Sequence, residues 1–167
     1  MDNEQREILE VDFLFVGAGP ASLVGALHLK NLLKDTNPEL SIAIIEKASE
    51  VGAHSLSGAV VDPITLNELF PNLSNEDFPF EYKVNKEYMY YLTKKGKCSV
   101  PFIPKPMSHH GCYISSIGKL TRWLEKKCEE AEIDIFAGFP GADIIYNNDS
   151  VIGVRTGDQG IDKNGNK

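Results

Sequence analysis

Residues 11–22 read VDFLFVGAGPAS, an apolar strand that runs directly into a glycine-rich turn. The turn has the pattern G-x-G-x-x-small, in which Gly17 permits the tight bend, Gly19 lets phosphate groups approach the backbone, and Ser22 is the third small residue. The helix that follows offers unpaired N–H groups and the positive end of its dipole. This stretch therefore predicts a site for the pyrophosphate of a dinucleotide.

The sequence on the C-terminal side of this turn supports the same interpretation. Residues 20–33 have apolar side chains at helical spacing and begin with Pro20, and residues 40–45 form a nearly continuous apolar run, typical of a parallel strand covered on both faces. The run ends at Glu46, 24 residues after Ser22, where a carboxylate accepts hydrogen bonds from ribose hydroxyls. Because this carboxylate would repel a ribose 2′-phosphate, FAD and NAD remain as ligands, beside the alternative of a βαβ unit without a ligand.

Composition narrows the class of protein. The chain has 167 residues, 42% of them hydrophobic, which is enough for one core but small for a dinucleotide enzyme with its own substrate domain. A formal net charge of −7 argues against nucleic acid as a partner. The densest basic cluster, KKGK at residues 94–97, is interpreted as a solvated hairpin turn.

The sequence shows no targeting signal and no paired cysteines. Residues 1–10 are acidic and polar rather than a signal or transit sequence, and no apolar run is long enough to span a membrane, so we expect the chain to stay in the compartment where it is made. The three cysteines, Cys98, Cys112 and Cys128, form no C-x-x-C pair. These cysteines therefore predict no disulfide framework and no metal site. Their pattern favours a reducing compartment.

Beyond Glu46 the pattern departs from a pure nucleotide-binding fold. A glycine- and serine-rich loop at residues 47–59 is suited to a close approach to a long cofactor, and Asp62 as N-cap with Pro63 at the first helical position predicts a short helix. The remaining predicted elements are a hairpin of residues 86–93 and 97–102, a proline-rich segment at 101–107, an amphipathic helix from about Ser116 with Trp123 in the core, a strand at 133–136, and a hairpin of residues 142–146 and 151–156.

Several of these segments together resemble the electron transfer flavoprotein-ubiquinone oxidoreductase family. They are the glycine turn, Glu46-Lys47, GAHSLSG at residues 52–58, Asp62-Pro63 with Leu69-Phe70-Pro71, and His110-Gly111 before Tyr113-Ile114. The resemblance covers essentially the whole chain, and the loop at 52–58 is a narrower signal than the glycine turn. Two positions differ from the usual family pattern: Ser22 stands where glycine is usual, and Cys112 where asparagine is common.

The resemblance implies an α/β fold, namely a Rossmann-like FAD-binding domain of glutathione-reductase type with an inserted β-hairpin region. We expect residues 1–167 to be an incomplete, N-terminal portion of this domain. It also implies an FAD-dependent oxidoreductase that takes electrons from reduced electron transfer flavoprotein and delivers them to ubiquinone at a membrane. By this resemblance the cofactor-binding residues are Gly17, Ala18, Gly19, Pro20, Ala21, Ser22, Glu46, Lys47, Gly52, Ala53, His54, Ser55, Ser57 and Gly58.

Other family features do not map onto this sequence. The family also holds a [4Fe-4S] cluster, which needs four thiolates, so its ligands are absent from these residues and no metal site is predicted. No catalytic acid, base or nucleophile is expected, because the flavin carries the chemistry. His54 is suited either to a hydrogen bond with the cofactor or to stabilising its own turn, and His109 and His110 are interpreted as loop residues.

Three alternatives stay open at this stage. A geranylgeranyl-reductase-like enzyme or an aromatic monooxygenase shares the glycine turn, and a non-catalytic nucleotide-binding remnant belongs to a different class. If the protein stopped at Lys167, its parallel sheet is expected to have an uncovered edge. Because residues 1–10 do not resemble a transit sequence, we expect a location at the cytoplasmic side of a bacterial inner membrane. The resemblance gives the mitochondrial inner membrane, where eukaryotic members act, as the alternative.

Overall fold

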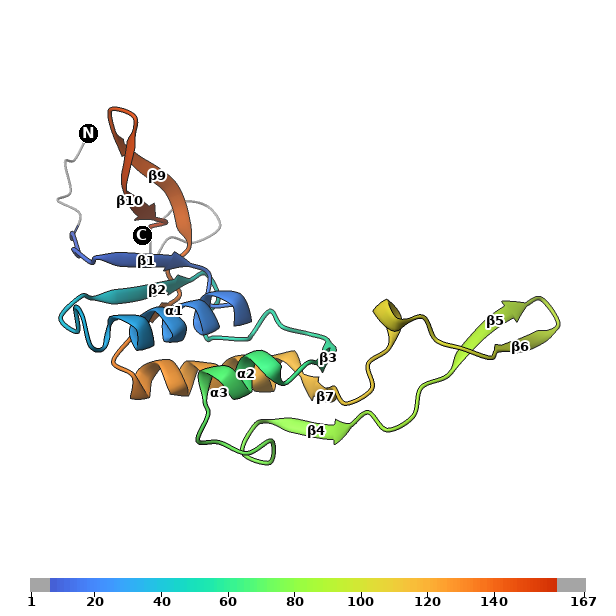
Figure 1. The fold of residues 1–167 in the computed structure, drawn as a ribbon. Coiled ribbons are helices and arrows are strands. Elements are labelled where there is room, and N and C mark those ends of the chain that lie inside the picture. The colour runs from blue at the N-terminus through green and yellow to red at the C-terminus, as the bar shows by residue number, and fades with distance from the viewer. Residues whose placement is uncertain (1–6, 159–167) are drawn as a thin grey trace.

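A computed structural model describes residues 7–158 of the chain, and a small parallel sheet lies at its centre. The strands β1 (Phe13–Val16), β2 (Ile42–Glu46) and β8 (Asp134–Ala137) lie in the order β1-β2-β8. In register, Phe13 faces Ile42 and Ala43 faces Asp134. The helices α1 (Pro20–Leu33) and α3 (Ile117–Glu130) pack side by side against one face of this sheet (Figure 1).

The core lies between these two helices and β2. All four residues of the run Ile42–Ile45 are buried, as expected for a parallel strand covered on both faces. Leu23 on α1 and Leu124 and Cys128 on α3 are fully buried, and the Cys128 Sγ lies 3.7 Å from the Leu23 carbonyl oxygen. The packing of α1 against α3 thus depends on these buried side chains next to β2.

A second, antiparallel sheet adjoins this core. It contains β3 (Gly58–Val61), β4 (Phe80–Lys83) and β7 (Tyr113–Ser116) in the order β3-β7-β4, and a short helix, α2 (Ile64–Leu69), follows β3. An aromatic cluster links this region to α3: the Trp123 ring lies edge-on to Phe70 and Phe78, with centroids 5.2 and 5.4 Å apart. Trp123 is half-buried in this cluster, which agrees with its predicted role in the core.

Two hairpins complete the described chain. The strands β5 (Met89–Thr93) and β6 (Gly96–Val100), followed by a 3₁₀ turn at Lys105–Met107, extend away from the rest of the molecule (Figure 1). The strands β9 (Gly141–Asn147) and β10 (Ser150–Thr156) form the other hairpin, which starts beside Val16 and Ile45. Within residues 7–158, β1 has no partner strand on its outer edge, and the Val16 side chain is 57% exposed there.

Most predicted elements are present, with three differences. The first hairpin is shorter than predicted, with strands Met89–Thr93 and Gly96–Val100 in place of 86–93 and 97–102. The helix predicted at Pro63 begins one residue later, at Ile64, with Pro63 as the N-cap in helical conformation. The Asp62 carboxylate accepts the Ile64 N–H at 3.1 Å, so Asp62 still binds a free amide at the start of the helix, as predicted. The sheet β3-β7-β4 was not predicted, and its first residue, Gly58, was assigned to the preceding loop. No helix within residues 7–158 is long and apolar enough to cross a membrane.

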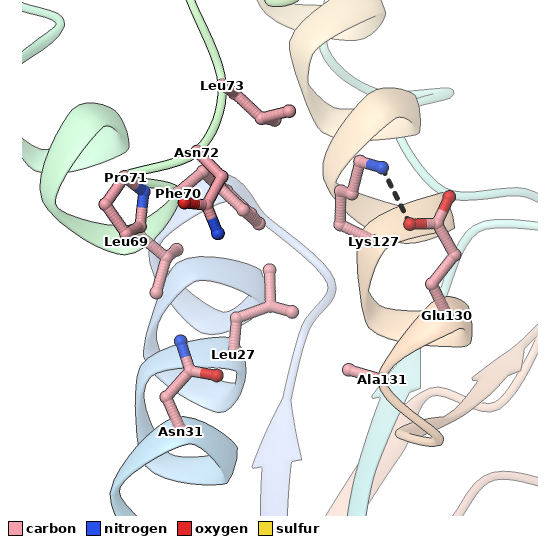
Figure 2. A pocket seen from close by; sticks show the side chains of 10 residues that line it. All are labelled: Leu27, Asn31, Leu69, Phe70, Pro71, Asn72, Leu73, Lys127, Glu130 and Ala131. Atoms are coloured by element: carbon pink, nitrogen blue, oxygen red, sulfur yellow. Dashed lines mark hydrogen bonds and ion pairs between the residues drawn. The ribbon is translucent and has the colours of Figure 1, made fainter.

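A shallow pocket of about 330 Å³ lies between α1, the end of α2 and α3. Figure 2 shows the side chains that line it. Leu27, Leu69 and Phe70 contribute its apolar lining. At its edge the Lys127 ammonium lies 2.6 Å from the Glu130 carboxylate. Because the pocket involves the C-terminal half of α1, it is separate from the glycine turn, which precedes the other end of that helix.

The packing of α3 predicts a clear contrast between two leucines on helices. Leu124 is 0% exposed, whereas Leu32 on α1 is 61% exposed. We expect Leu124→Ala to lower the free energy of unfolding by about 2–5 kcal/mol, because it removes buried methyl groups and leaves a cavity. Leu32→Ala is the control and should change it by less than about 0.5 kcal/mol. Urea denaturation followed by circular dichroism measures both, and equal losses would contradict the described core.

Candidate dinucleotide-binding site

The glycine turn leaves β1 sharply and opens outward. The Gly17 N–H donates to the Ile45 carbonyl at 2.7 Å, and Gly17 has φ +95°, a left-handed conformation that favours glycine. A Cβ added at Gly17 or Gly19 would meet no protein atom within 4 Å. The backbone here is therefore bare, and the space that a ligand needs in front of it is open.

The N-terminus of α1 has backbone N–H groups that bind no recorded acceptor within the described chain. Gly19 is the N-cap, Pro20 is the first helical residue, and no side chain caps the helix. The first helical hydrogen bond runs from the Leu23 N–H to the Gly19 carbonyl at 3.1 Å. Within the described chain no acceptor is recorded for the amides of Gly19, Ala21 and Ser22. These N–H groups and the helix dipole together suit an anion such as a phosphate.

Glu46 links this turn to the segment after β2. Its Oε2 accepts the Ala18 N–H and its Oε1 accepts the Ala48 N–H, each at 2.8 Å. The half-buried carboxylate is thereby held beside the glycine turn, which is the place predicted for a ribose-binding acid. The neighbouring Lys47 is exposed.

A second turn, after β8, holds the backbone of this acidic residue. The Phe139 N–H donates to the Glu46 carbonyl at 2.8 Å, and the Gly138 N–H donates to the Ala48 carbonyl at 2.7 Å. Gly138 has φ +85°, so glycine suits this turn. Sequence reasoning missed this support, although the glycine directly after a predicted strand was a signal for a special turn.

The loop at residues 52–58 is anchored to the start of α3. The Ile117 N–H donates to the Ser57 carbonyl at 3.2 Å, and a Cβ on the buried Gly118 would lie 3.2 Å from the Ser55 carbonyl oxygen. The Ser55 N–H donates to the Gly52 carbonyl at 3.0 Å, while the His54 side chain is exposed. The loop thus has a defined shape that depends on close backbone packing.

The structure brings some predicted site residues together and leaves others apart. Glu46 touches the glycine turn directly through the Ala18 amide. Between residues 52–58 and 17–22 no hydrogen bond is recorded in the described chain, although both segments follow the carboxyl ends of parallel strands. This edge is where α/β sheets bind their ligands.

No metal-binding cluster of three or more histidine, cysteine or acidic side chains occurs within residues 7–158. The cysteines differ in environment: Cys98 is exposed and Cys112 half-buried. Burial, followed by the charges of Glu125 and Glu129, raises the pKa of the Cys128 thiol to about 12. Cys128 is therefore an unreactive core residue.

The relatives found by comparison with known sequences carry the same name. The chain is 44% identical to a probable electron transfer flavoprotein-ubiquinone oxidoreductase of Acinetobacter baylyi, over 96% of this chain and 29% of that protein. It is 41% identical to the Pseudomonas aeruginosa enzyme of this name, over 97% of this chain and 30% of that protein. Nearly the whole chain is thus homologous to one part of the electron transfer flavoprotein-ubiquinone oxidoreductases. This confirms the resemblance stated from the motifs.

The same relationship extends to eukaryotes. The mitochondrial electron transfer flavoprotein-ubiquinone oxidoreductase of Arabidopsis thaliana is 40% identical over 97% of this chain and 25% of its own length. The chain spans between a quarter and a third of the length of these curated relatives. No protein-family model matches it.

Solved structures share the fold at low sequence identity. A geranylgeranyl bacteriochlorophyll reductase-like protein from Thermoplasma acidophilum has a TM-score of 0.61 at 20% identity, over 87% of this chain and 34% of that chain. The myxobacterial halogenase CndH, a variant of FAD-dependent halogenases, has a TM-score of 0.58 at 16% identity, over 87% and 32%. These likenesses confirm the predicted α/β fold.

The two hydrogen bonds of Glu46 predict a cost when its carboxylate is removed. We expect Glu46→Ala to lower the free energy of unfolding by about 2 kcal/mol, because the amides of Ala18 and Ala48 lose a charged acceptor. Glu39→Ala is the matched control, since Glu39 is exposed and its carboxylate has no recorded hydrogen bond. Chemical denaturation without added nucleotide measures both variants. Equal stability of the two would show that the Glu46 bridge contributes nothing.

Proposed function

We propose that this chain forms the FAD-binding part of an oxidoreductase that accepts electrons from reduced electron transfer flavoprotein and passes them to ubiquinone. The observation that carries the proposal is the open glycine turn, whose free amides lie beside the carboxylate of Glu46. Similarity to oxidoreductases of this name over nearly the whole chain supports the choice of electron donor and acceptor.

The residues present fit a dinucleotide such as FAD. In the proposal the amides of residues 17–22 bind the pyrophosphate, and the carboxylate of Glu46 binds the ribose of the adenosine half. The Glu46 carboxylate also disfavours a cofactor with a ribose 2′-phosphate. Residues 52–58 hold the flavin side, and the domain is of glutathione-reductase type. The solved structure of CtdE in complex with FAD, at a TM-score of 0.57, supports a cofactor of this kind.

The chain's own residues bind and orient rather than transfer protons. Bound flavin supplies the redox chemistry, because it takes up two electrons and releases them singly. The bridge from Glu46 to Ala18 and Ala48 holds the site in one shape, and the packing of Gly118 against the Ser55 carbonyl fixes the loop at the flavin side. A [4Fe-4S] cluster, in this proposal, is held by sequence outside these 167 residues, since the chain has three cysteines.

Contact with a membrane surface is the second element of the proposal. We define the arm as residues 84–108, which include β5, β6 and the 3₁₀ turn. It extends away from the body of the protein (Figure 1). Several large apolar or aromatic side chains of the arm are exposed: Tyr88, Tyr90, Tyr91, Leu92, Phe102 and Met107. Five lysines accompany them: Lys86, Lys94, Lys95, Lys97 and Lys105.

This combination suits the interface of a bilayer. Tyrosine rings and lysines favour the headgroup level, and each lysine near an anionic surface contributes about 1 kcal/mol of attraction. The arm's basic charge is unusual in a chain with a net charge of −7. The lysines at 94–97, interpreted from sequence as a solvated turn, lie at the tip of this arm and are proposed to face lipid headgroups. The proposal places the protein at the cytoplasmic side of a bacterial inner membrane or at the mitochondrial inner membrane.

The glycine turn gives the direct test of cofactor binding. We expect Gly19→Val to weaken FAD binding about 10- to 100-fold, because a branched side chain overlaps the phosphates and such overpacking costs about 1–3 kcal/mol. Gly19 has φ −79°, and no atom lies within 4 Å of a Cβ there, so the variant is expected to fold normally. The measurement is the flavin absorbance retained after incubation with FAD and desalting.

Gly25→Ala is the matched control for this test. Gly25 lies within α1, the helix that Gly19 precedes as N-cap, and its Cβ would make an ordinary 3.4 Å contact with the Phe15 ring. Circular dichroism melting shows whether both variants are folded. A folded Gly19→Val protein that binds FAD as the parent does would refute the assignment of the glycine turn.

Membrane contact is tested by co-sedimentation with vesicles of phosphatidylcholine containing about 30% phosphatidylglycerol, an anionic lipid. We expect Leu92→Asp to reduce binding, because Leu92 is 74% exposed at the arm and a charge there is repelled by apolar and anionic lipid. Leu32→Asp on α1 is the control, because Leu32 is also exposed, at 61%, but lies outside the arm. Loss of binding at high salt is also expected, because salt screens lysine charges. Equal binding by both variants would exclude the arm as the contact.

A further inference from the structure

A carboxylate at the base of the arm joins its two sides. Glu87 Oε1 accepts the His109 backbone N–H at 2.8 Å and lies 3.0 Å from His109 Nδ1. Glu87 Oε2 accepts the Ser108 hydroxyl at 3.0 Å. We call these three residues the clasp. They connect positions 21 and 22 residues apart in the sequence, before and after the β5-β6 hairpin.

The clasp lies where other connections are few. Closer to the body, the Val84 N–H donates to the Cys112 carbonyl at 2.8 Å, and farther out the β5-β6 pairing begins at Met89 and Val100. Between the clasp and the hairpin is a hollow of about 410 Å³, lined by Met89, Val100, Phe102 and Ile103 among others. Within the described chain, the recorded hydrogen bonds between residues 85–88 and residues 101–109 are those of Glu87.

The Glu87 carboxylate is surrounded by hydrogen-bond donors of the clasp. It is the one acidic residue of the arm, and its recorded partners are Ser108 and His109 rather than a lysine. Its side chain is 18% exposed, which is little for a carboxylate on a projecting segment. The backbone N–H of His109, with smaller contributions from Ser108 and the His109 ring, lowers the pKa of Glu87 below its ordinary value. The carboxylate therefore stays ionised near neutral pH. In this state it accepts hydrogen bonds from the Ser108 hydroxyl, the His109 backbone N–H and the His109 ring.

We propose that Glu87 is a positioning residue that fixes the direction of the arm relative to β7, so that the exposed aromatic rings and lysines meet a bilayer as one rigid face. This inference rests on the proposed membrane contact. A freely swinging arm loses conformational entropy when it binds a surface, whereas a braced arm has already lost it on folding. Glu87 thereby increases affinity for the membrane without touching lipid.

The direction of the arm is measured by electron paramagnetic resonance between two spin labels on the 167-residue chain. One label is attached to Cys98, which is exposed on β6, and the other to a cysteine introduced by Glu129→Cys on the outer side of α3. Cys112→Ser prevents a third label, and Cys128 is buried and does not react. The parent should give a narrow distance distribution, and Glu87→Ala a broad one.

Two further variants make the result specific. Glu87→Gln is expected to give a distance distribution of intermediate width, because its amide oxygen still accepts the His109 N–H. Glu81→Ala is the matched control, since Glu81 on β4 forms an exposed ion pair with Lys119, 2.7 Å apart, outside the arm. Its distribution should equal that of the parent. If Glu87→Ala does not fold by circular dichroism, Ser108→Ala takes its place, because it removes a single donor from the clasp.

The outcomes separate this inference from the proposed function. A distribution as narrow in the clasp variants as in the parent overturns the inference. A broad distribution together with about threefold or greater loss of binding to the anionic vesicles supports it, a change of the size expected when one side chain or loop must be ordered on binding. A broad distribution with unchanged vesicle binding overturns the claim that direction matters for binding. If the parent itself does not bind vesicles, the proposed membrane contact fails, whatever the distances show.

Discussion

The carboxylate of Glu46 is the interaction on which the candidate site depends. It accepts the amides of Ala18 and Ala48, and so joins the turn after β1 to the segment after β2 at one edge of the parallel sheet. The turn after β8 binds the same segment through the Glu46 and Ala48 carbonyls. All three parallel strands therefore end in one hydrogen-bonded unit, while the neighbouring amides at the start of α1 stay free for a ligand.

This arrangement needs a rigid support, which the apolar strand β2 supplies. Its residues 42–45 are buried between neighbours, with α1 and α3 covering one face, so the position of Glu46 at the strand's end is fixed by packing. The backbone groups of the site are held by strands and a helix start rather than by long side chains. Such a site is preorganised, because few rotatable bonds must be ordered when a ligand binds.

The unit from β1 to Glu46 could be predicted from sequence because each of its signals is local: a glycine turn, a helical period, an apolar run and an acid at fixed spacing. The hairpins β5-β6 and β9-β10 were predictable for the same reason. The sheet β3-β7-β4 was not, since its four-residue strands carry weak periodicity and pair across long separations, as Gly58 does with Ser116. Glu46 was predicted as a ribose ligand, but its bonds to backbone amides depend on tertiary structure and were missed.

The arm shows how the same residues take on a different meaning once their position is known. In sequence, the lysines at 94–97 are ordinary turn residues, and Glu87 is one carboxylate among 24 acidic residues. In the structure, the lysines lie at the tip of a projecting hairpin with exposed aromatic rings, and Glu87 joins the two sides of its base. Glu87 is thus separated along the arm from the three lysines at its tip. The acid is bound by internal donors and does not pair with the lysines of the tip, which in the proposed membrane contact face the anionic lipid.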